Sequence, residues 1–456
     1  MNMLSALRRR LSQSIIPRSD KSAVPPAGVY HFVRETPQEK SRIHLRLDPD
    51  GNGVLMVNAS RIYHLNPSAA FMAHLLLSET PMPDAVTLLT REYAVSRAQA
   101  QEDYSTVSDQ IDQLIRPDGA CPICDLDLET TAPFSAQLTA PYRMDLAITY
   151  RCQNNCAHCY NARPRQYPEL TTHQWFDVLD KLWEIGIPHI VFTGGEPTLR
   201  EDLPELIAHA EKNGQISGIN TNGRKLKDPA YLAELVDAGL DHVQITLESH
   251  RADIHDGMVR LPGAWEETSA GLKNAVASRL YVMTNTTLLQ ANSPYLSDTL
   301  IFLGELGVPT IGLNALIYSG KGETVGTGLR AEDLPPILDL AQGLTHKYNQ
   351  RLIWYTPTQY CHFDPMSLSL GVKGCTAALF NMCIEPDGKV IPCQSYYEPV
   401  GDILTDPWQQ IWNHELCLSL RERRNLPDEC NSCLMLPECG GGCPLERRAI
   451  SPMVAL

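Results

Sequence analysis

Three cysteines, Cys152, Cys156 and Cys159, lie close together in the segment Tyr-Arg-Cys-Gln-Asn-Asn-Cys-Ala-His-Cys-Tyr. The segment follows the apolar run Met144 to Thr149, which predicts a buried strand. Three thiolates hold a 4Fe-4S cluster and leave one iron open to a small molecule, whereas four thiolates close it. The spacing therefore favours a cluster that takes part in chemistry, with a zinc knuckle as the simpler alternative.

A second motif, Thr-Gly-Gly-Glu-Pro-Thr at residues 193–198, follows the next predicted strand. Gly194 and Gly195 remove side chains where the backbone must approach a ligand, and Glu196 offers a carboxylate to an ammonium group. The cysteine loop followed by this motif resembles the radical S-adenosylmethionine (radical SAM) superfamily. The resemblance implies that the open iron binds the amino and carboxylate groups of S-adenosylmethionine, and that one-electron reduction yields a 5′-deoxyadenosyl radical.

Polar residues end the next two predicted strands. Thr221 and Asn222 end the third strand, and Thr246, with Glu248 nearby, ends the fourth. The resemblance implies that these residues border the ribose and the methionyl part of the cofactor. Together with Gly194, Gly195 and Glu196 they form the predicted cofactor-binding set.

The C-terminal region carries a further cysteine pattern. Gly388 lies five positions before Cys393, and the last four cysteines have gaps of two, five and three residues. The pattern resembles the SPASM domain, which carries one or two auxiliary 4Fe-4S clusters. The resemblance assigns two ligand groups: Cys375, Cys393 and Cys443 for the first cluster, and Cys430, Cys433 and Cys439 for the second.

The ligation of these auxiliary clusters stays open, because the family has one further cysteine downstream and none follows Cys443 here. Cys361 or Cys383 is a candidate to complete the first cluster. Cys417 or Glu446 is a candidate for the second, unless that cluster has an open iron or is absent. The pair Cys121 and Cys124 is assigned no role.

Composition restricts the class of protein. The 456 residues predict two or three domains, and the formal net charge of −15 disfavours binding to nucleic acid or to an anionic membrane. The fourteen cysteines fall in two clusters, at 121–159 and 361–443, which favours metal binding in a reducing cytoplasm over a disulfide framework. No signal peptide or membrane-spanning segment is predicted.

The predicted fold class is α/β. From Met144 six apolar strands alternate with helical patterns, which predicts a partial (β/α)6 barrel. Upstream, three strands within residues 42–65 and three helices predict a winged-helix-like domain. The predicted parts are a flexible tail (1–25), the winged-helix-like domain (26–118), a linker (119–141), the barrel (142–350) and the cysteine-rich iron-sulfur domain (351–456).

The winged-helix-like domain is acidic along its helices, which is the wrong sign for DNA and favours holding a peptide. The segment Arg61 to Phe71 resembles the precursor-peptide recognition element of ribosomal peptide biosynthesis. The combined resemblance implies a maturase that captures a leader peptide by strand addition and introduces a thioether, a carbon-carbon crosslink or an epimerised residue. A flavodoxin or ferredoxin is the expected electron donor.

Two alternatives stay open at this point. The first keeps the radical SAM chemistry but changes the substrate to a folded protein, such as a sulfatase, or to a tetrapyrrole. The second is an iron-sulfur redox sensor without enzymatic activity.

Overall fold

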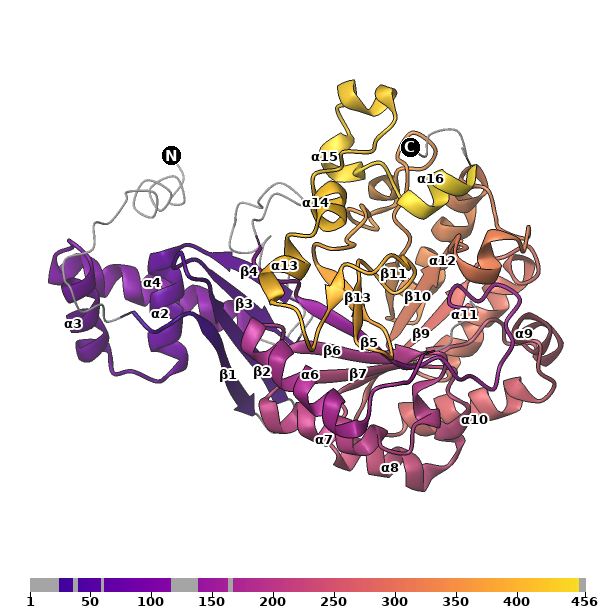
Figure 1. The fold of residues 1–456 in the computed structure, drawn as a ribbon, viewed down its shortest axis with the longest axis horizontal. Helices are drawn as coiled ribbons and strands as arrows, with labels where there is room; N and C mark the ends of the chain where they lie inside the picture. The colour runs from indigo at the N-terminus through magenta and orange to yellow at the C-terminus, as the bar shows by residue number, and fades with distance from the viewer. Residues whose placement is uncertain (1–23, 36–39, 59–60, 116–137, 163–166, 451–456) are drawn as a thin grey trace. The chain divides into compact units, whose positions relative to one another are not determined.

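The computed structural model describes residues 24–35, 40–58, 61–115, 138–162 and 167–450. Most of the expected tail and linker, including Cys121 and Cys124, lies outside these ranges. The chain forms two compact units (Figure 1), the first from residues 1–131 with 182–188 and the second from the remainder. Within the described ranges, every helix is too short or too polar to span a lipid bilayer.

The first unit combines an antiparallel sheet with three helices. The strands lie in the order β1 (Gly28–Glu35), β2 (Lys40–Leu47), β3 (Gly53–Val57) and β4 (Arg61–Leu65). The helices are α2 (Pro67–Leu77), α3 (Met82–Glu92) and α4 (Arg97–Ile115). The structure confirms the three strands and three helices expected from residue 42 onward and adds β1, which the sequence analysis missed.

Capping residues set where two of these helices begin. The Asn66 side chain accepts a hydrogen bond from Ala69 N at 2.9 Å, and proline follows Asn66 at the first helical position. Ser96 Oγ accepts from Gln99 N at 3.2 Å at the start of α4. The helices bury Phe71, Leu89 and other apolar side chains against the inner face of the sheet.

The second unit contains a ten-stranded sheet in the order β11-β10-β9-β8-β7-β6-β5-β12-β13-β14. Neighbours from β5 to β11 pair in parallel. Their bounds are β5 (Arg143–Thr149), β6 (His189–Gly194), β7 (Ile216–Thr221), β8 (His242–Thr246), β9 (Tyr281–Thr287), β10 (Thr310–Asn314) and β11 (Arg351–Trp354). The six predicted barrel strands are confirmed, and β11 is a seventh.

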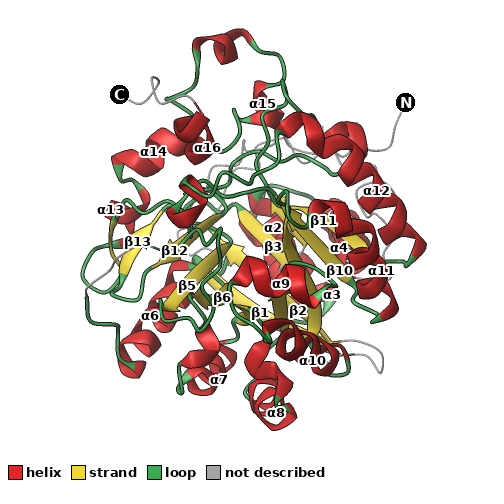
Figure 2. Ribbon diagram, turned by 90° about the vertical axis from the view of Figure 1, so that its right-hand side faces the viewer, coloured by secondary structure: helices red, strands yellow, loops and turns green. Residues whose placement is uncertain are grey.

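Helices alternate with these strands and cover their outer side, where α7, α8 and α10 lie together in Figure 2. The helices are α6 (Thr172–Ile185), α7 (Leu203–Asn213), α8 (Pro229–Asp237), α9 (Ala252–Val259), α10 (Ala264–Val276), α11 (Leu296–Glu305) and α12 (Leu334–Lys347). The short 3-10 helices η1 (Pro197–Leu199), η2 (Arg224–Lys227) and η4 (Gly320–Glu323) follow strands β6, β7 and β10. This arrangement places the loops after the strands at one edge of the sheet, as in other parallel barrels.

The C-terminal region continues the same sheet. Strand β12 (Asn381–Ile384) pairs in parallel with β5 and forms an antiparallel hairpin with β13 (Lys389–Ile391), which pairs with β14 (Gly401–Asp402). The remaining helices are α13 (Trp408–Trp412), α14 (Glu415–Arg421), α15 (Leu436–Cys439) and α16 (Pro444–Ile450). The pairing of β12 with β5 therefore joins the cysteine-rich region to the barrel, which the sequence analysis did not predict.

Candidate active site

The first three-cysteine segment, here called the cluster loop (residues 150–162), follows β5 and is anchored to the end of α9. Asn155 N donates to Val259 O at 3.0 Å, and Ala157 N donates to Met258 O at 2.9 Å. These bonds fix the middle of the loop through its main chain. The loop geometry therefore does not depend on side-chain contacts alone.

A second anchor comes from the segment after β10. Lys321 N donates to the carbonyl of Cys159 at 3.0 Å, and the Lys321 ammonium donates to the Asn155 side chain. Gly320 also lies close to the loop, since a Cβ there would stand 2.5 Å from Tyr160 O. Residues about 160 positions apart in the chain thus hold the same loop from two sides.

The charges of the three thiols of the loop act on one another. The pKa of Cys152 is raised to about 11, mainly by burial and less by the charges of Glu196 and Cys159, while a hydrogen bond from Asn154 N opposes the shift. Burial also raises the pKa of Cys156, followed by the charges of Glu248, Cys159 and Cys152. The loop therefore gathers three thiols next to two of the predicted cofactor-binding carboxylates.

Among the residues that the structure describes, no three His, Cys, Asp or Glu side chains surround a single metal-ion position. In a 4Fe-4S cluster each thiolate binds a different iron atom, so its ligands stand farther apart than those of one ion. The finding about single metal-ion positions therefore does not bear on a 4Fe-4S cluster at these cysteines.

Gly194 and Gly195 let strand β6 approach the start of the cluster loop. Gly195 N donates to Thr149 O at 2.8 Å, and a Cβ on Gly194 would lie 2.0 Å from the same oxygen. A Cβ on Gly195 would lie 2.3 Å from Arg151 O. The structure gives the two glycines a packing role against the chain itself, which brings Glu196 beside the loop.

The carboxylate of Glu196 is fully buried at the end of β6 and accepts four hydrogen bonds. Oε1 accepts from Thr198 N (3.1 Å), Thr198 Oγ1 (2.7 Å) and Thr221 Oγ1 (2.7 Å), and Oε2 accepts from Asn222 N (2.8 Å). Burial raises the pKa of Glu196, and these donors oppose that shift. Because Oε2 has a single donor, it keeps capacity for one from a ligand.

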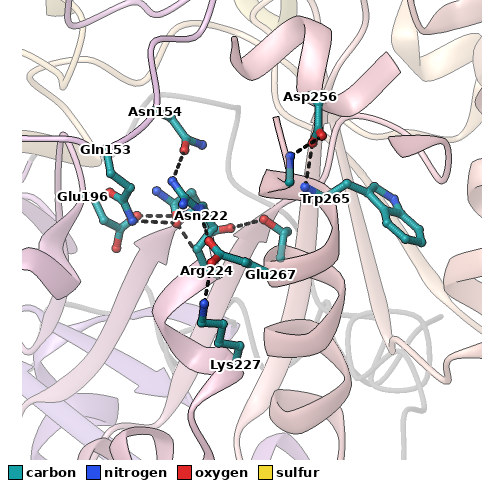
Figure 3. A network of polar contacts seen from close by, with 12 residues as sticks. Gln153, Asn154, Glu196, Asn222, Arg224, Lys227, Asp256, Trp265 and Glu267 are labelled. Atoms are coloured by element: carbon teal, nitrogen blue, oxygen red, sulfur yellow. Dashed lines mark hydrogen bonds and ion pairs between the residues drawn. The ribbon is translucent and has the colours of Figure 1, made fainter. Parts of the chain in front are cut away.

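A polar network joins the cluster loop to the end of β7 and to α10 (Figure 3). Asn222 Oδ1 accepts from Arg224 N at 3.1 Å and from Gln153 Nε2 at 3.5 Å. The Arg224 guanidinium donates to Asn154 Oδ1 at 2.9 Å and to Glu267 Oε2 at 2.6 Å. Arg224 is thus the residue that connects the loop to a helix.

The α9–α10 connection is itself fixed by the half-buried side chain of Asp256. Asp256 accepts from Trp265 N at 2.7 Å and from Gly263 N at 2.6 Å, at the start of α10 (Figure 3). Asp256 lies directly before the α9 carbonyls that anchor the cluster loop. Asp256 therefore supports the loop indirectly.

Glu248 occupies the corresponding place after β8. Its Oε1 pairs with His158 Nε2 of the cluster loop at 3.0 Å, and its Oε2 accepts from Thr287 N at 3.0 Å. Asn292 donates to Glu248 O at 2.9 Å. Thr246 ends β8 half-buried, two residues before Glu248. The structure thus brings the β7 and β8 ends to opposite parts of one loop.

Several buried polar atoms around this loop have no hydrogen-bond partner among the described residues. They are Gln153 Oε1, His158 Nδ1, Asn222 Nδ2 and His255 Nε2. His255 Nδ1 accepts from Glu248 N at 3.2 Å, so the neutral ring carries its proton on the unpartnered Nε2. Buried polar groups normally find partners, so these donors and acceptors fit a polar small molecule such as S-adenosylmethionine.

The C-terminal cysteines form two groups. Burial raises the pKa of Cys375 to about 12, and the charges of Cys443 and Cys393 add to this. Cys430 and Cys439 belong to a separate group. Burial is the main cause that raises the pKa of Cys430, and the charge of Cys439 is the next. These charge effects link Cys375 to Cys393 and Cys443, and Cys430 to Cys439, while the assignment of the cysteines to two clusters stays a prediction.

The remaining candidates lie in different surroundings. Cys383 is buried in β12 with Ala147 and Ile391, and Cys417 is buried in α14. Glu446, considered for the second cluster, lies beside Cys443 of the first group, where its charge raises the pKa of that thiol.

The sequence analysis missed four residues that position this site: His158, Arg224, Glu267 and Lys321. His158 lies inside the three-cysteine motif, and Arg224 follows Asn222 and Gly223, so proximity in sequence was an available signal for these two. Glu267 and Lys321 reach the site from distant segments and carry no local signal.

Models of three protein families match the chain. The radical SAM superfamily matches residues 146–294, the SPASM iron-sulfur cluster-binding domain matches residues 375–434, and the coenzyme PQQ synthesis protein D (PqqD) family matches residues 45–113. The chain therefore contains a radical SAM domain and is an enzyme. It also carries a SPASM domain and a PqqD domain, which is a precursor-peptide recognition element.

These domains define the cofactors and exclude one alternative. A radical SAM domain binds a 4Fe-4S cluster and S-adenosylmethionine, and the SPASM domain binds auxiliary iron-sulfur clusters. A radical SAM enzyme is not a redox sensor without catalytic activity. The non-enzymatic interpretation is therefore wrong.

Two curated relatives carry different names. Fe-coproporphyrin III synthase of Methanosarcina barkeri is 28% identical over 336 residues, which cover 66% of this chain and 83% of that protein. Mycofactocin maturase MftC of Mycobacterium tuberculosis is 28% identical over 324 residues, 68% of this chain and 80% of that protein. Similarity at this level does not choose between their substrates.

Solved structures share the fold. SuiB of Streptococcus suis bound to its precursor peptide SuiA aligns with a TM-score of 0.66 and 14% identity, covering 91% of this chain and 96% of that one. The AdoMet-bound anSMEcpe structure with a peptide aligns with a TM-score of 0.55 and 16% identity, covering 68% and 90%. The α/β fold with its C-terminal cysteine-rich domain is therefore confirmed.

Proposed function

We propose that this enzyme modifies a ribosomally made precursor peptide, forming a thioether, a carbon-carbon crosslink or an epimerised residue. The PqqD domain in the same chain as the radical SAM domain is the observation that carries this proposal. A fused recognition element serves no purpose for a small, freely diffusing substrate. A peptide with a leader segment is the substrate class that such an element would hold.

The leader would bind at the outer edge of β4. Strand β4 is an edge of the four-stranded sheet and lies inside the PqqD match, whereas the opposite edge strand, β1, lies outside it. An edge strand is the place where a sheet can take up another strand. Ile62 on β4 is 36% exposed and offers an apolar contact to the added strand.

At the barrel, we propose that Cys152, Cys156 and Cys159 bind the catalytic 4Fe-4S cluster. When bound, the cluster and S-adenosylmethionine supply a 5′-deoxyadenosyl radical that abstracts hydrogen from the substrate. Glu196 would accept from the ammonium of the methionyl group through its Oε2. The buried, unpartnered Asn222 Nδ2 and His255 Nε2 would donate to polar atoms of the same ligand.

The other predicted cofactor contacts follow the same geometry. Thr246 ends β8, and Glu248, two residues later, pairs with His158 of the cluster loop. Thr221 supports Glu196 through its hydroxyl. Gly194 and Gly195 let these parts approach one another. A flavodoxin or ferredoxin, in the cytoplasm, is the one-electron donor that we propose for the catalytic cluster.

The experiment uses the peptide encoded by a short open reading frame beside the gene. Its affinity for the full-length enzyme is measured by fluorescence polarisation, with Ile62→Lys as the test variant. The matched control is Val33→Lys, because Val33 is 43% exposed on the opposite edge strand. We expect Ile62→Lys to weaken binding about tenfold, the loss of one buried apolar contact, and Val33→Lys to leave it unchanged.

Turnover completes the test. The reconstituted enzyme, S-adenosylmethionine, a reductant and the peptide are incubated, and the product is analysed by mass spectrometry in deuterated water. A crosslink removes hydrogen from the peptide, and epimerisation introduces deuterium. A peptide that neither binds nor changes would contradict the proposal.

A tetrapyrrole substrate is the second candidate, because curated relatives are named Fe-coproporphyrin III synthase and AdoMet-dependent heme synthase. The same reaction with an iron-coproporphyrin in place of the peptide distinguishes the two. Conversion of the tetrapyrrole without peptide modification would favour this candidate.

A further inference from the structure

The second group of C-terminal cysteines contains more than the three residues expected from its spacing. The segment that precedes Cys361 packs directly on Cys439: Tyr360 N donates to Cys439 Sγ at 3.3 Å, and that sulfur lies 3.6 Å from Thr358 O. Cys361 therefore directly follows Tyr360, whose main-chain N–H contacts Cys439, a predicted ligand of the second cluster.

The same two segments meet again at Gly442, three residues after Cys439, and at Gln359, which lies between Thr358 and Tyr360. A Cβ on Gly442 would stand 2.6 Å from Gln359 Cγ and 3.2 Å from Gln359 N. No side chain fits at residue 442, because the 358–361 segment occupies that space. The two segments of the chain are therefore packed against each other over several residues, and the hydrogen bond to Cys439 is one part of this contact.

The charge of Cys361 and the charges of the second group of cysteines act on one another. Burial is the main cause of the raised pKa of Cys361. A main-chain hydrogen bond lowers this pKa, and the charges of Cys439 and Cys433 raise it. In return, Cys361 is among the charges that raise the pKa of Cys430. These charge effects agree with the contacts of Tyr360 N and Thr358 O with Cys439 Sγ, which place the Cys361 segment beside the second group.

The first group is separate from this one. The thiol neighbours that raise the pKa of Cys375 are Cys443 and Cys393. Ala378 N, three residues after Cys375, donates to Pro392 O at 2.9 Å, which holds the Cys375 segment against the β13 end that carries Cys393. The expectation that left Cys361 as a candidate for the first cluster therefore does not fit this geometry.

We propose that Cys361 is the fourth ligand of the second auxiliary cluster, together with Cys430, Cys433 and Cys439. It supplies the fourth thiolate from a segment that precedes the other three cysteines in the chain. A cluster closed by four thiolates transfers electrons and has no iron position for a substrate atom. This inference does not depend on the identity of the substrate.

The other candidates lie elsewhere. Cys417 is buried in α14, and the charge that acts on its thiol is that of Arg421. Glu446 lies beside Cys443, in the first group. Cys417 is therefore a matched control, since it is a cysteine of the same region that belongs to neither group.

The test measures iron and sulfide per chain, together with Mössbauer spectra, in the full-length protein reconstituted under anaerobic conditions. All variants are made in a background that lacks the three loop cysteines, so that auxiliary clusters alone contribute. We expect Cys361→Ala to lose up to about four iron atoms per chain or to convert one cluster to a three-iron form. Cys417→Ala should match the parent.

Double variants assign the cysteine to its cluster. If Cys361 and Cys430 hold the same cluster, the C361A/C430A variant loses no more iron than C430A alone, whereas losses in C361A/C375A add. The reverse pattern would place Cys361 in the first cluster and overturn the proposal. Unchanged iron and spectra in C361A, or equal iron loss in C361A and C417A, would also overturn it. Circular dichroism confirms that each variant is folded.

Discussion

The cluster loop and the C-terminal cysteine region both gather thiols, but they do so in different ways. The loop takes three cysteines from one short segment and fixes them with bonds from α9, η2 and the segment after β10. The C-terminal region draws its cysteines from residues 361–443, carried by short elements and turns. Local spacing therefore identifies the chemistry of the loop, whereas tertiary packing decides which C-terminal thiols share a cluster.

The largest expected difference between the two regions is in cofactor cleavage. Replacing the three loop cysteines by alanine should abolish 5′-deoxyadenosine formation, because this loop alone lies beside Glu196 and Glu248. Replacing Cys430, Cys433 and Cys439 should leave nucleoside formation within about tenfold of the parent, while peptide modification is lost. Both are measured by liquid chromatography after reduction. Nucleoside release by the loop variant would contradict the distinction.

Replacing a glycine by alanine should destabilise the two regions to different extents. A Cβ at Gly195 meets main-chain oxygens at 2.3 and 2.7 Å that cannot move aside, so Gly195→Ala should cost about 3 kcal/mol and prevent cluster loading. Gly441 has a φ of +76°, and its Cβ would meet the flexible tip of Leu426, so Gly441→Ala should cost about 1–2 kcal/mol. Thermal unfolding midpoints of the two variants compare these costs. Equal midpoints would show that the loop packing is no more rigid than the C-terminal turn.

The fold was largely predictable where the sequence pattern is local. The six barrel strands and the Asn66 and Ser96 helix starts follow from apolar runs and caps. Strand β11 is short and partly exposed, and β1 is an edge strand, so neither carries a strong apolar signal. The pairing of β12 with β5 joins distant segments and has no signature in either strand.

The site shows the same division. Glu196, Thr221 and Asn222 were predicted together from the resemblance to the radical SAM superfamily. The structure brings them to one edge of the parallel sheet, where Thr221 and Asn222 donate hydrogen bonds to Glu196. The bond between Arg224 and Glu267 spans 43 positions and links two surface elements. Charged residues of this kind are common on helices, so nothing in the sequence distinguishes this pair from an ordinary exposed one.

An intermediate effect is expected at Glu196, where one side chain serves both packing and binding. Glu196→Gln keeps the shape but turns one acceptor oxygen into a donor that faces other donors, which costs about 1–3 kcal/mol. Affinity for S-adenosylmethionine should fall about tenfold or more, measured by equilibrium dialysis with the reconstituted enzyme. Glu205→Gln, on the exposed face of α7, is the control and should bind normally. Unchanged affinity in Glu196→Gln would remove Glu196 from the binding site.

The smallest expected effect tests how much one side-chain anchor adds to the cluster loop. Arg224→Ala removes the bonds to Asn154 and Glu267 but leaves the main-chain bonds to α9, so the loop should loosen without unfolding. Losing a partly buried hydrogen bond costs about 1 kcal/mol, which predicts that the cluster is lost roughly threefold to tenfold faster. The measurement is bleaching of the iron-sulfur absorbance by a chelator, in a background without auxiliary cysteines. Arg330→Ala, which breaks an exposed ion pair with Asp333, should bleach at the parent rate. If the two variants bleach equally fast, the main-chain bonds alone hold the loop, and the side-chain network of Figure 3 serves the ligand instead.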